Sequence, residues 1–248
     1  MYFFFSGEGK TDFGTNNDHP GPLAHVINQI IAEHHQYSLL ASERIIFVHR
    51  AELERIKNSV EFKPESKRSI RLPSRNVPPE TRYHYDDARA FSRATKHTID
   101  GKDKSDREFV AVLFRDSNSP DEKEWNDKRN SMLWGFHVER IEKHGVAAVA
   151  RPISEAWWLS ALDRRTAPNQ GTKYEEMRRG GIAGDHRLKK ELGDDASRDA
   201  LVEMIHNKDI DYTLIDSASF LAFLYDFRQA VGLGHLNPRR QRQDNEVI

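Results

Sequence analysis

The chain has 248 residues, of which 37% are hydrophobic and 31% are charged. This length suits one full-sized α/β domain, or one domain with a small appendage. The 38 basic and 39 acidic residues leave a formal net charge of -1, which excludes a uniformly cationic DNA-coating protein but allows a local basic groove. Cysteine is absent, so disulfides, cysteine-ligated zinc, iron–sulfur clusters and thiol nucleophiles are excluded.

The hydrophobic run at the N-terminus is too short for a signal peptide and has no basic flank. No segment approaches the roughly 18 apolar residues that a membrane span needs. We therefore expect a cytoplasmic protein without a membrane partner.

Strands and helices alternate over the first two thirds of the chain. Short apolar runs bounded by turns predict the strands, and apolar residues at helical spacing predict the helices. In chain order we expect a strand at 2–5, a helix at 22–35, a strand at 44–48, helices at 51–58 and 86–97, a strand at 109–114, a helix at 122–144, a strand at 145–150 and a helix at 155–162. This order predicts an α/β fold with a mostly parallel sheet and helices on both faces.

A basic segment rich in Pro and Ser, at about 59–83, interrupts this alternation. We expect it to be an insertion, either a solvated surface loop or a flap that contacts phosphate groups. Its candidate nucleic-acid-binding residues are Lys67, Arg68, Arg71 and Arg75.

The character of the chain changes after residue 163. We expect residues 164–236 to form a helical extension packed on the core of residues 1–163, with helices at 185–192, 197–206 and 217–231. Residues 237–248 are rich in Arg and Gln and are expected to be a disordered tail.

Acidic residues follow three of the predicted strands. Glu8 follows the first strand, Asp116 follows the third, and Glu155 lies five residues beyond the fourth; Asp12 comes four residues after Glu8. The carboxyl ends of parallel strands share one edge of a sheet, where ligands bind. Clustered carboxylates repel one another without a cation, and Mg²⁺ or Mn²⁺ prefers such oxygen ligands. The alternative for any single acid is helix capping, for which Asp121 is a further candidate.

The segment Gly9-Lys10-Thr11 invites comparison with a phosphate-binding P-loop. That loop requires a glycine five positions before its Gly-Lys-Thr, and the residue there is Phe4, inside the predicted strand. A P-loop nucleotide enzyme is therefore the weakest of the functions considered, and Lys10 is instead expected to contact nucleic acid.

Three segments resemble TOPRIM domains. Residues 4–12, Phe-Phe-Ser-Gly-Glu-Gly-Lys-Thr-Asp, resemble the first motif, in which a strand leads into a Glu-Gly turn. Residues 110–118 resemble the second motif, usually Asp-x-Asp, and residues 151–159, Arg-Pro-Ile-Ser-Glu-Ala-Trp-Trp-Leu, resemble a segment of the small stand-alone TOPRIM proteins close to OLD-family nucleases. The resemblance covers roughly residues 1–230 and implies a TOPRIM-like, Rossmann-like core.

The resemblance also implies a metal-dependent centre that cleaves phosphodiester bonds or transfers strands. Glu8 matches the invariant glutamate of the family, and Asp12 matches an acid found one helical turn later in the OLD-like branch. Asp116 matches the first acid of the Asp-x-Asp pair, and Glu155 matches the later acidic ligand. The chain is too short for a strand-passage gate, so hydrolysis is expected rather than a topoisomerase reaction.

The chain departs from the family pattern at Asn118, which stands where the second acid of the pair is expected. Its amide oxygen can ligate a metal but brings no charge, and Asp121 is a candidate to compensate. OLD-like enzymes also use a lysine after the last strand. Lys173 is the nearest candidate for that catalytic role, and Lys189 is its rival.

The expected function is a metal-dependent nuclease for DNA or RNA. Family context suggests the effector of a bacterial defence or toxin-like module that works with an ATPase partner. The alternative is a catalytically weakened TOPRIM-like protein that binds nucleic acid or regulates a partner, which Asn118 favours.

The remaining aromatic and histidine residues are assigned structural roles. No pair of histidines has the spacing of a zinc-protease helix. Trp157 and Trp158 are expected to pack behind the acidic edge rather than to stack on a base. The scattered histidines, expected to be solvated or locally hydrogen-bonded, are His84, His97, His137, His144 and His186.

Overall fold

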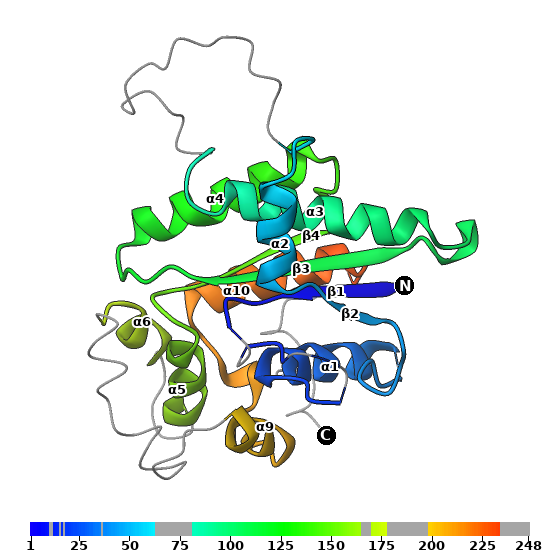
Figure 1. Ribbon diagram of the computed structural model, residues 1–248. Helices are drawn as coiled ribbons and strands as arrows, with labels where there is room; N and C mark the ends of the chain where they lie inside the picture. The colour runs from blue at the N-terminus through cyan, green and yellow to red at the C-terminus, as the bar shows by residue number, and fades with distance from the viewer. Residues whose placement is uncertain are drawn as a thin grey trace, which may run out of the picture.

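A four-stranded sheet lies at the centre of the computed structural model, in the order β2-β1-β3-β4 (Figure 1). All three neighbouring pairs of strands are parallel. The strands are β1 (Tyr2–Ser6), β2 (Ile45–Phe47), β3 (Phe109–Asp116) and β4 (Gly145–Ala150). The structure describes residues 1–9, 12–14, 16, 18–35, 37–62, 81–164, 170–177 and 198–233. The predicted α/β class and parallel sheet are confirmed.

The sheet is buried on both faces. Alternate residues of a strand point to opposite sides, and in β3 Val110 and Val112 join one apolar cluster while Ala111 and Leu113 join the other. All four of these side chains have no exposed surface. This explains why β3 is a continuous apolar run rather than an alternation of apolar and polar residues.

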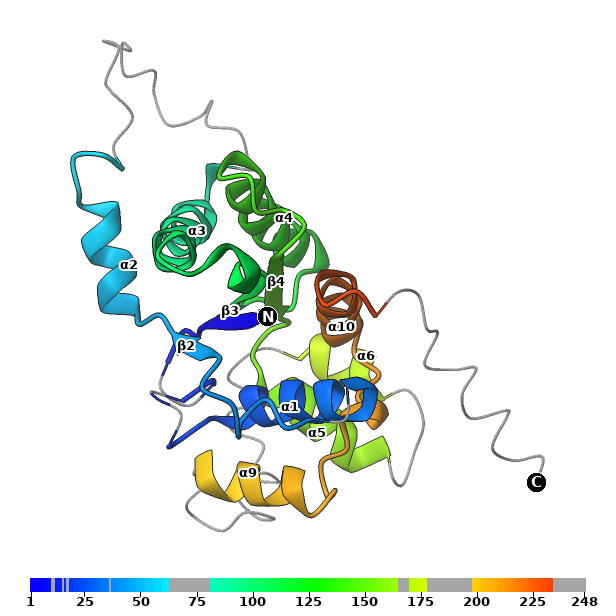
Figure 2. The same ribbon diagram turned by 90° about the vertical axis from the view of Figure 1, so that its right-hand side faces the viewer.

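Helices form a layer on each face of the sheet (Figures 1 and 2). One apolar cluster includes side chains of α1 (Pro22–His35), α5 (Glu155–Arg164), α6 (Gln170–Glu175), α9 (Arg198–His206) and α10 (Ala218–Ala230). The other includes side chains of α2 (Arg50–Lys57), α3 (Tyr85–Asp100) and α4 (Glu122–Val138). Two short 3-10 turns, η3 (Lys104–Asp106) and η4 (Tyr212–Leu214), complete the elements described.

The helices after residue 164 contribute to the same apolar core as the sheet. Phe220, Phe223 and Phe227 of α10 are completely buried. Phe227 lies 6.4 Å from the ring of Phe3 in β1, and Phe223 stacks on Trp157 at 5.9 Å. The indole nitrogen of Trp157 donates a hydrogen bond to Ser219 Oγ at 2.7 Å. Packing was the predicted role of Trp157, and the structure confirms it.

The two largest differences from the predicted elements are the end of α4 and the presence of α6. The helix predicted to reach residue 144 ends at Val138, because Arg140 adopts a left-handed conformation with φ of 59° that a helix cannot continue through. Helix α6 lies in a stretch for which no element was predicted, since six residues are too few to show an apolar period. The predicted helix at 185–192 and the tail at 237–248 lie outside the described residues.

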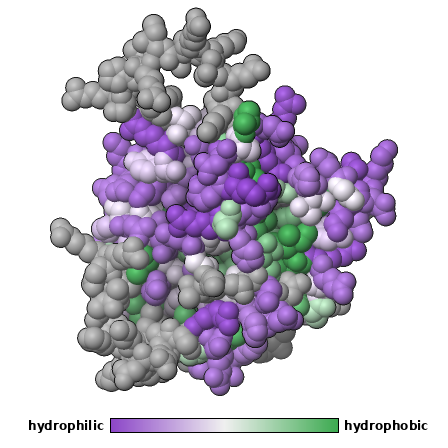
Figure 3. Space-filling view, in the orientation of Figure 1, coloured by the Kyte–Doolittle hydropathy of each residue, from purple (hydrophilic) through white to green (hydrophobic). Residues whose placement is uncertain are grey.

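The surface seen in Figure 3 is largely hydrophilic, with hydrophobic side chains confined to small areas. Among the residues that the structure describes, no helix is both long enough and apolar enough to cross a membrane.

Candidate functional site

Four carboxylates gather at the carboxyl ends of the strands. Glu8 lies in the turn after β1, Asp116 is the last residue of β3, and Glu155 is the first residue of α5, which follows β4. The register pairs Asp116 with Ala150, so β3 and β4 end side by side. The main-chain N–H of Asp116 donates a hydrogen bond to Glu8 Oε2 at 2.9 Å. The predicted meeting of these acids at one edge of the sheet is therefore observed.

Asp12 joins this group from the loop between β1 and α1. Its Oδ2 accepts a hydrogen bond from the main-chain N–H of Gly9 at 3.0 Å. Its carbonyl accepts one from Leu23 in the first turn of α1. This close approach requires glycine at position 21, because a Cβ there would lie 2.5 Å from the carbonyl oxygen of Asp12.

Ser154 links Asp116 to Glu155. Its main-chain N–H donates to Asp116 Oδ1 at 3.0 Å, and its hydroxyl donates to Glu155 Oε2 at 3.4 Å. The start of α5 is thus held against the end of β3, which keeps both carboxylates at the same edge.

The electrostatics show that the four carboxylates act on one another. Burial raises the pKa of Asp116 from 3.8 to about 8, and the charges of Asp12, Glu155 and Glu8 add to this rise. Burial also raises the pKa of Asp12 to about 6, with Glu155 and Glu8 again contributing. Burial and the neighbouring acids therefore favour either a proton or a cation at Asp116 and Asp12.

The donor chemistry of the cluster fits a hard divalent cation such as Mg²⁺ or Mn²⁺, which prefers carboxylate oxygens. In their present positions, no three Asp, Glu or His side chains of the described residues form a ligand set for one ion. One oxygen each of Glu8, Asp12 and Asp116 accepts a main-chain hydrogen bond instead. Ligation by several of them at once would require side-chain rotation.

Asn118 and Asp121 both make local hydrogen bonds after β3. Asn118 is exposed, has a left-handed backbone with φ of 56°, and donates from its side-chain nitrogen to the carbonyl of Asp116 at 3.4 Å. Asp121 caps α4, because its Oδ1 accepts from the N–H of Glu124 at 2.7 Å. The capping alternative is therefore correct for Asp121, and compensation of Asn118 by Asp121 is not observed.

The structure places Lys173 next to Asp163, at the far end of α5 from Glu155. Lys173 Nζ lies 3.7 Å from Asp163 Oδ2. Asp163 follows Glu155 by eight positions, which corresponds to about 12 Å along a helix. The catalytic role of Lys173 stays a prediction. The other predicted basic residues lie outside the described residues: Lys10, Lys67, Arg68, Arg71, Arg75 and Lys189.

Lys128 is a basic residue near the site that the sequence pattern did not indicate. Its ammonium donates to the carbonyl of Ser117, the residue after Asp116, and to Glu124 Oε1 at 2.6 Å. Only 12% of its side chain is exposed. The i,i+4 spacing of Glu124 and Lys128 is visible in the sequence. The sequence has no signal that this face of α4 lies against the end of β3.

His84 also lies near the site and is half-buried, and the prediction that it is solvated or locally hydrogen-bonded does not hold for its Nε2. Its Nε2 is buried and has no hydrogen-bond partner. Burial lowers its pKa to about 4, with smaller effects from the charges of Arg115, Asp87, Lys128 and Glu8. The imidazole of His84 is therefore neutral at pH 7, within reach of the charges of both Glu8 and Lys128.

No family model, curated protein or solved structure matches the chain. Fold and site together define the class of protein as an α/β protein with a parallel sheet and an acidic cluster at its carboxyl edge.

Proposed function

We propose that the chain is a metal-dependent nuclease that hydrolyses phosphodiester bonds in DNA or RNA, with a TOPRIM-like core close to the OLD-family nucleases. The observation that carries this proposal is the position of Asp116, whose pKa is raised to about 8 by burial and by three neighbouring carboxylates. Glu8, Asp116 and Glu155 lie at or after the ends of β1, β3 and β4 in chain order, and each lies in a segment that resembles a TOPRIM motif.

Each residue of the site has a role in this proposal. A bound Mg²⁺ or Mn²⁺ would activate a water molecule and neutralise charge on the phosphate. Asp12, Asp116 and Glu155 would hold that ion together with Glu8, whose hydrogen bond to the N–H of Asp116 keeps two strand ends in register. The ammonium of Lys128 binds the carbonyl of Ser117, the residue after Asp116, and would offset negative charge that develops on the phosphate.

The biological setting is proposed from the resemblance alone. Small stand-alone TOPRIM proteins commonly belong to bacterial defence or toxin-like modules. The chain would be the effector of such a module in the cytoplasm. Such an effector would work with an ATPase partner protein, which would supply any control by nucleotide.

Cleavage of supercoiled plasmid, single-stranded DNA and structured RNA, each with Mg²⁺ or Mn²⁺, tests the proposal. Glu8→Gln should lower the rate by about a hundredfold or more, because it removes one charged group from a preorganised site. Glu142→Gln is the matched control, since Glu142 is exposed and lies just before β4, at the other end of that strand. Equal activity of Glu8→Gln and the wild type would overturn the assignment of the site.

A second candidate is a catalytically weakened TOPRIM-like protein that binds nucleic acid or regulates a partner. It is favoured by Asn118, which replaces an expected acid, is exposed, and donates its side-chain amide to the main chain. This protein would bind nucleic acid without cleaving it and would show no stabilisation by divalent metal.

A further inference from the structure

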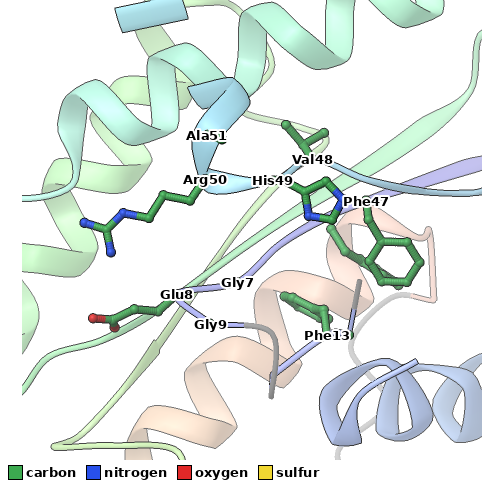
Figure 4. Close-up of a pocket in the computed structure, with 11 residues that line it drawn as sticks. Gly7, Glu8, Gly9, Phe13, Phe47, Val48, His49, Arg50 and Ala51 are labelled. Atoms are coloured by element: carbon green, nitrogen blue, oxygen red, sulfur yellow. The ribbon is translucent and has the colours of Figure 1, made fainter. Parts of the chain in front are cut away.

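A cavity of about 300 Å³ is lined by Glu8, one of the four clustered carboxylates (Figure 4). It lies at the carboxyl ends of β1 and β2, between the glycine turn at residues 7–9 and the start of α2. Glu8 lines this cavity and also accepts the hydrogen bond from the N–H of Asp116. The cavity therefore opens directly beside the proposed catalytic centre.

Aromatic rings form one side of the cavity. Phe13 stacks on Phe5 at 4.7 Å with an interplanar angle of 10°, and Phe47 meets Phe5 edge-on at 5.9 Å. Phe5 and Phe13 are almost completely buried, whereas Phe47 is only half-buried. The ring of Phe47 is thus held by the core and is still available to a ligand. An aromatic surface of this kind can stack on any base, since every base has a π-face.

The other side of the cavity is polar. Figure 4 shows Phe13 and Phe47 on one side of the glycine turn, and the side chains of Glu8 and Arg50 extending together on the other. Arg50 is exposed at the first position of α2. Gly7 and Gly9 line the cavity between the two sides.

The other basic side chains named near the site form ion pairs with carboxylates, whereas Arg50 does not within the described part of the chain. Arg115 and Lys57 both bind the carboxylate of Asp87, at 2.9 and 2.7 Å, and Lys128 binds Glu124. Among the residues that the structure describes, no ion pair involves Arg50. A guanidinium without a carboxylate partner, beside an acidic cluster, is suited to a phosphate, which it can bind through two parallel hydrogen bonds.

We propose that this cavity binds one unpaired nucleotide of a single-stranded substrate, with the base against Phe47 and the phosphate between Arg50 and the four carboxylates. The inference rests on the proposed nuclease function and names its substrate class. A volume of about 300 Å³ is at the lower limit of small-molecule sites, so it suits one nucleotide and not a base pair. A base in a duplex would have to leave the stack to enter.

The test is binding of labelled oligothymidylate and oligouridylate, and of their duplexes with complementary strands, to the full chain carrying Asp116→Asn. That substitution should prevent cleavage, so the labelled strands stay intact while binding is measured. Single strands should bind about tenfold more tightly than duplexes. Phe47→Leu, which keeps an apolar side chain, and Arg50→Ala should each weaken single-strand binding by about tenfold, as expected for loss of one base stack or one phosphate contact.

Two matched controls should change the affinity by less than about twofold, as is usual for surface substitutions away from a site. Arg55→Ala removes another exposed arginine of α2, one already paired with Glu52, and Trp134→Leu removes an exposed aromatic ring on α4. The subsite would be overturned if duplex and single strand bound equally tightly. It would also be overturned if the control variants weakened binding as much as Phe47→Leu and Arg50→Ala. Arg50 is exposed, so its variant decides the question even if Phe47→Leu is unstable.

Cleavage assays separate this inference from the function on which it rests. Metal-dependent cleavage without any effect of Phe47→Leu or Arg50→Ala would retain the nuclease and overturn the subsite. The expected binding pattern without cleavage of any substrate would retain the subsite and overturn the nuclease.

Discussion

Glu8 and Asp116, 108 positions apart in the sequence, are joined by a 2.9 Å hydrogen bond from the N–H of Asp116 to Glu8 Oε2. This bond connects the turn after β1 to the end of β3 and brings two acidic groups into one site. Glutamine at position 8 retains an acceptor for the bond but lacks the charge. Glu8→Gln therefore separates the structural role of this residue from its electrostatic role.

The metal-free protein should lose stability as the pH rises through about 7 to about 8 and should level off above that, because the raised pKa of Asp116 lets the folded state keep, up to about pH 8, a proton that the unfolded chain has released. The pKa values of His25 and His84, both lowered to about 4, act in the opposite direction. Their effect is confined to pH values below about 6.5, where unfolded histidine titrates. Thermal melts in the presence of a chelator, at a series of neutral and alkaline pH values, measure the slope, that is, how stability changes with pH.

Asp116→Asn should remove most of that slope, since an amide is neutral at every pH. Asp18→Asn, an exposed change in the loop before α1, serves as the control and should leave the slope unchanged. The same pH profile in Asp116→Asn and the wild type would show that Asp116 does not carry the raised pKa.

Divalent metal should stabilise the protein at a pH above 8, where Asp116 is ionised. A ligand at a hundred times its Kd adds about 2.7 kcal/mol to the free energy of unfolding, which for a chain of this size raises Tm by about 5–10 °C. Differential scanning fluorimetry with Mg²⁺ or Mn²⁺ measures the shift, which Asp116→Asn should largely abolish and Glu142→Gln should retain. A wild-type protein that shows no shift would support the catalytically weakened alternative.

Lys128 and Lys173 are competing candidates for the basic residue that assists cleavage. Because Lys128 lies beside Ser117 and Lys173 lies beside Asp163, Lys128→Met should lower the cleavage rate by about tenfold or more, and Lys173→Met should change it by less than about twofold. Rates are compared at saturating metal, with melts to confirm folding. The opposite ranking would restore Lys173 to the role that the family resemblance implies.

Trp157→Ala should lower the free energy of unfolding by about 3–5 kcal/mol, because it leaves a cavity in the core. It also leaves Ser219 without its indole donor. Trp134→Ala removes a ring that is 42% exposed and stacks on His137, and it should cost only about 1 kcal/mol. Urea denaturation measures both. Similar losses for the two variants would contradict the packing role of Trp157.

Continuous apolar runs and helical spacing predicted the strands and the large helices correctly, because these patterns reflect burial by layers on both faces of a sheet. The residues at which helices and strands end were less predictable. The end of α4 depends on the left-handed conformation of Arg140, and the last residues of β3, Arg115 and Asp116, are polar. Pairing with β4 extends β3 over those two residues, and this pairing has no local signal.

The sequence alone determined which acids follow which strands, and parallel pairing then required them to meet at one edge. Only the tertiary structure decided what surrounds them. Lys128, His84 and Arg50 reach the site from α4, the start of α3 and the start of α2, three segments whose packing on the sheet brings them within reach of residues distant in sequence. Charge and burial in the site depend on that packing, and so does the raised pKa of Asp116, because neither a low local dielectric nor a neighbouring charge is a property of the chain as a linear sequence.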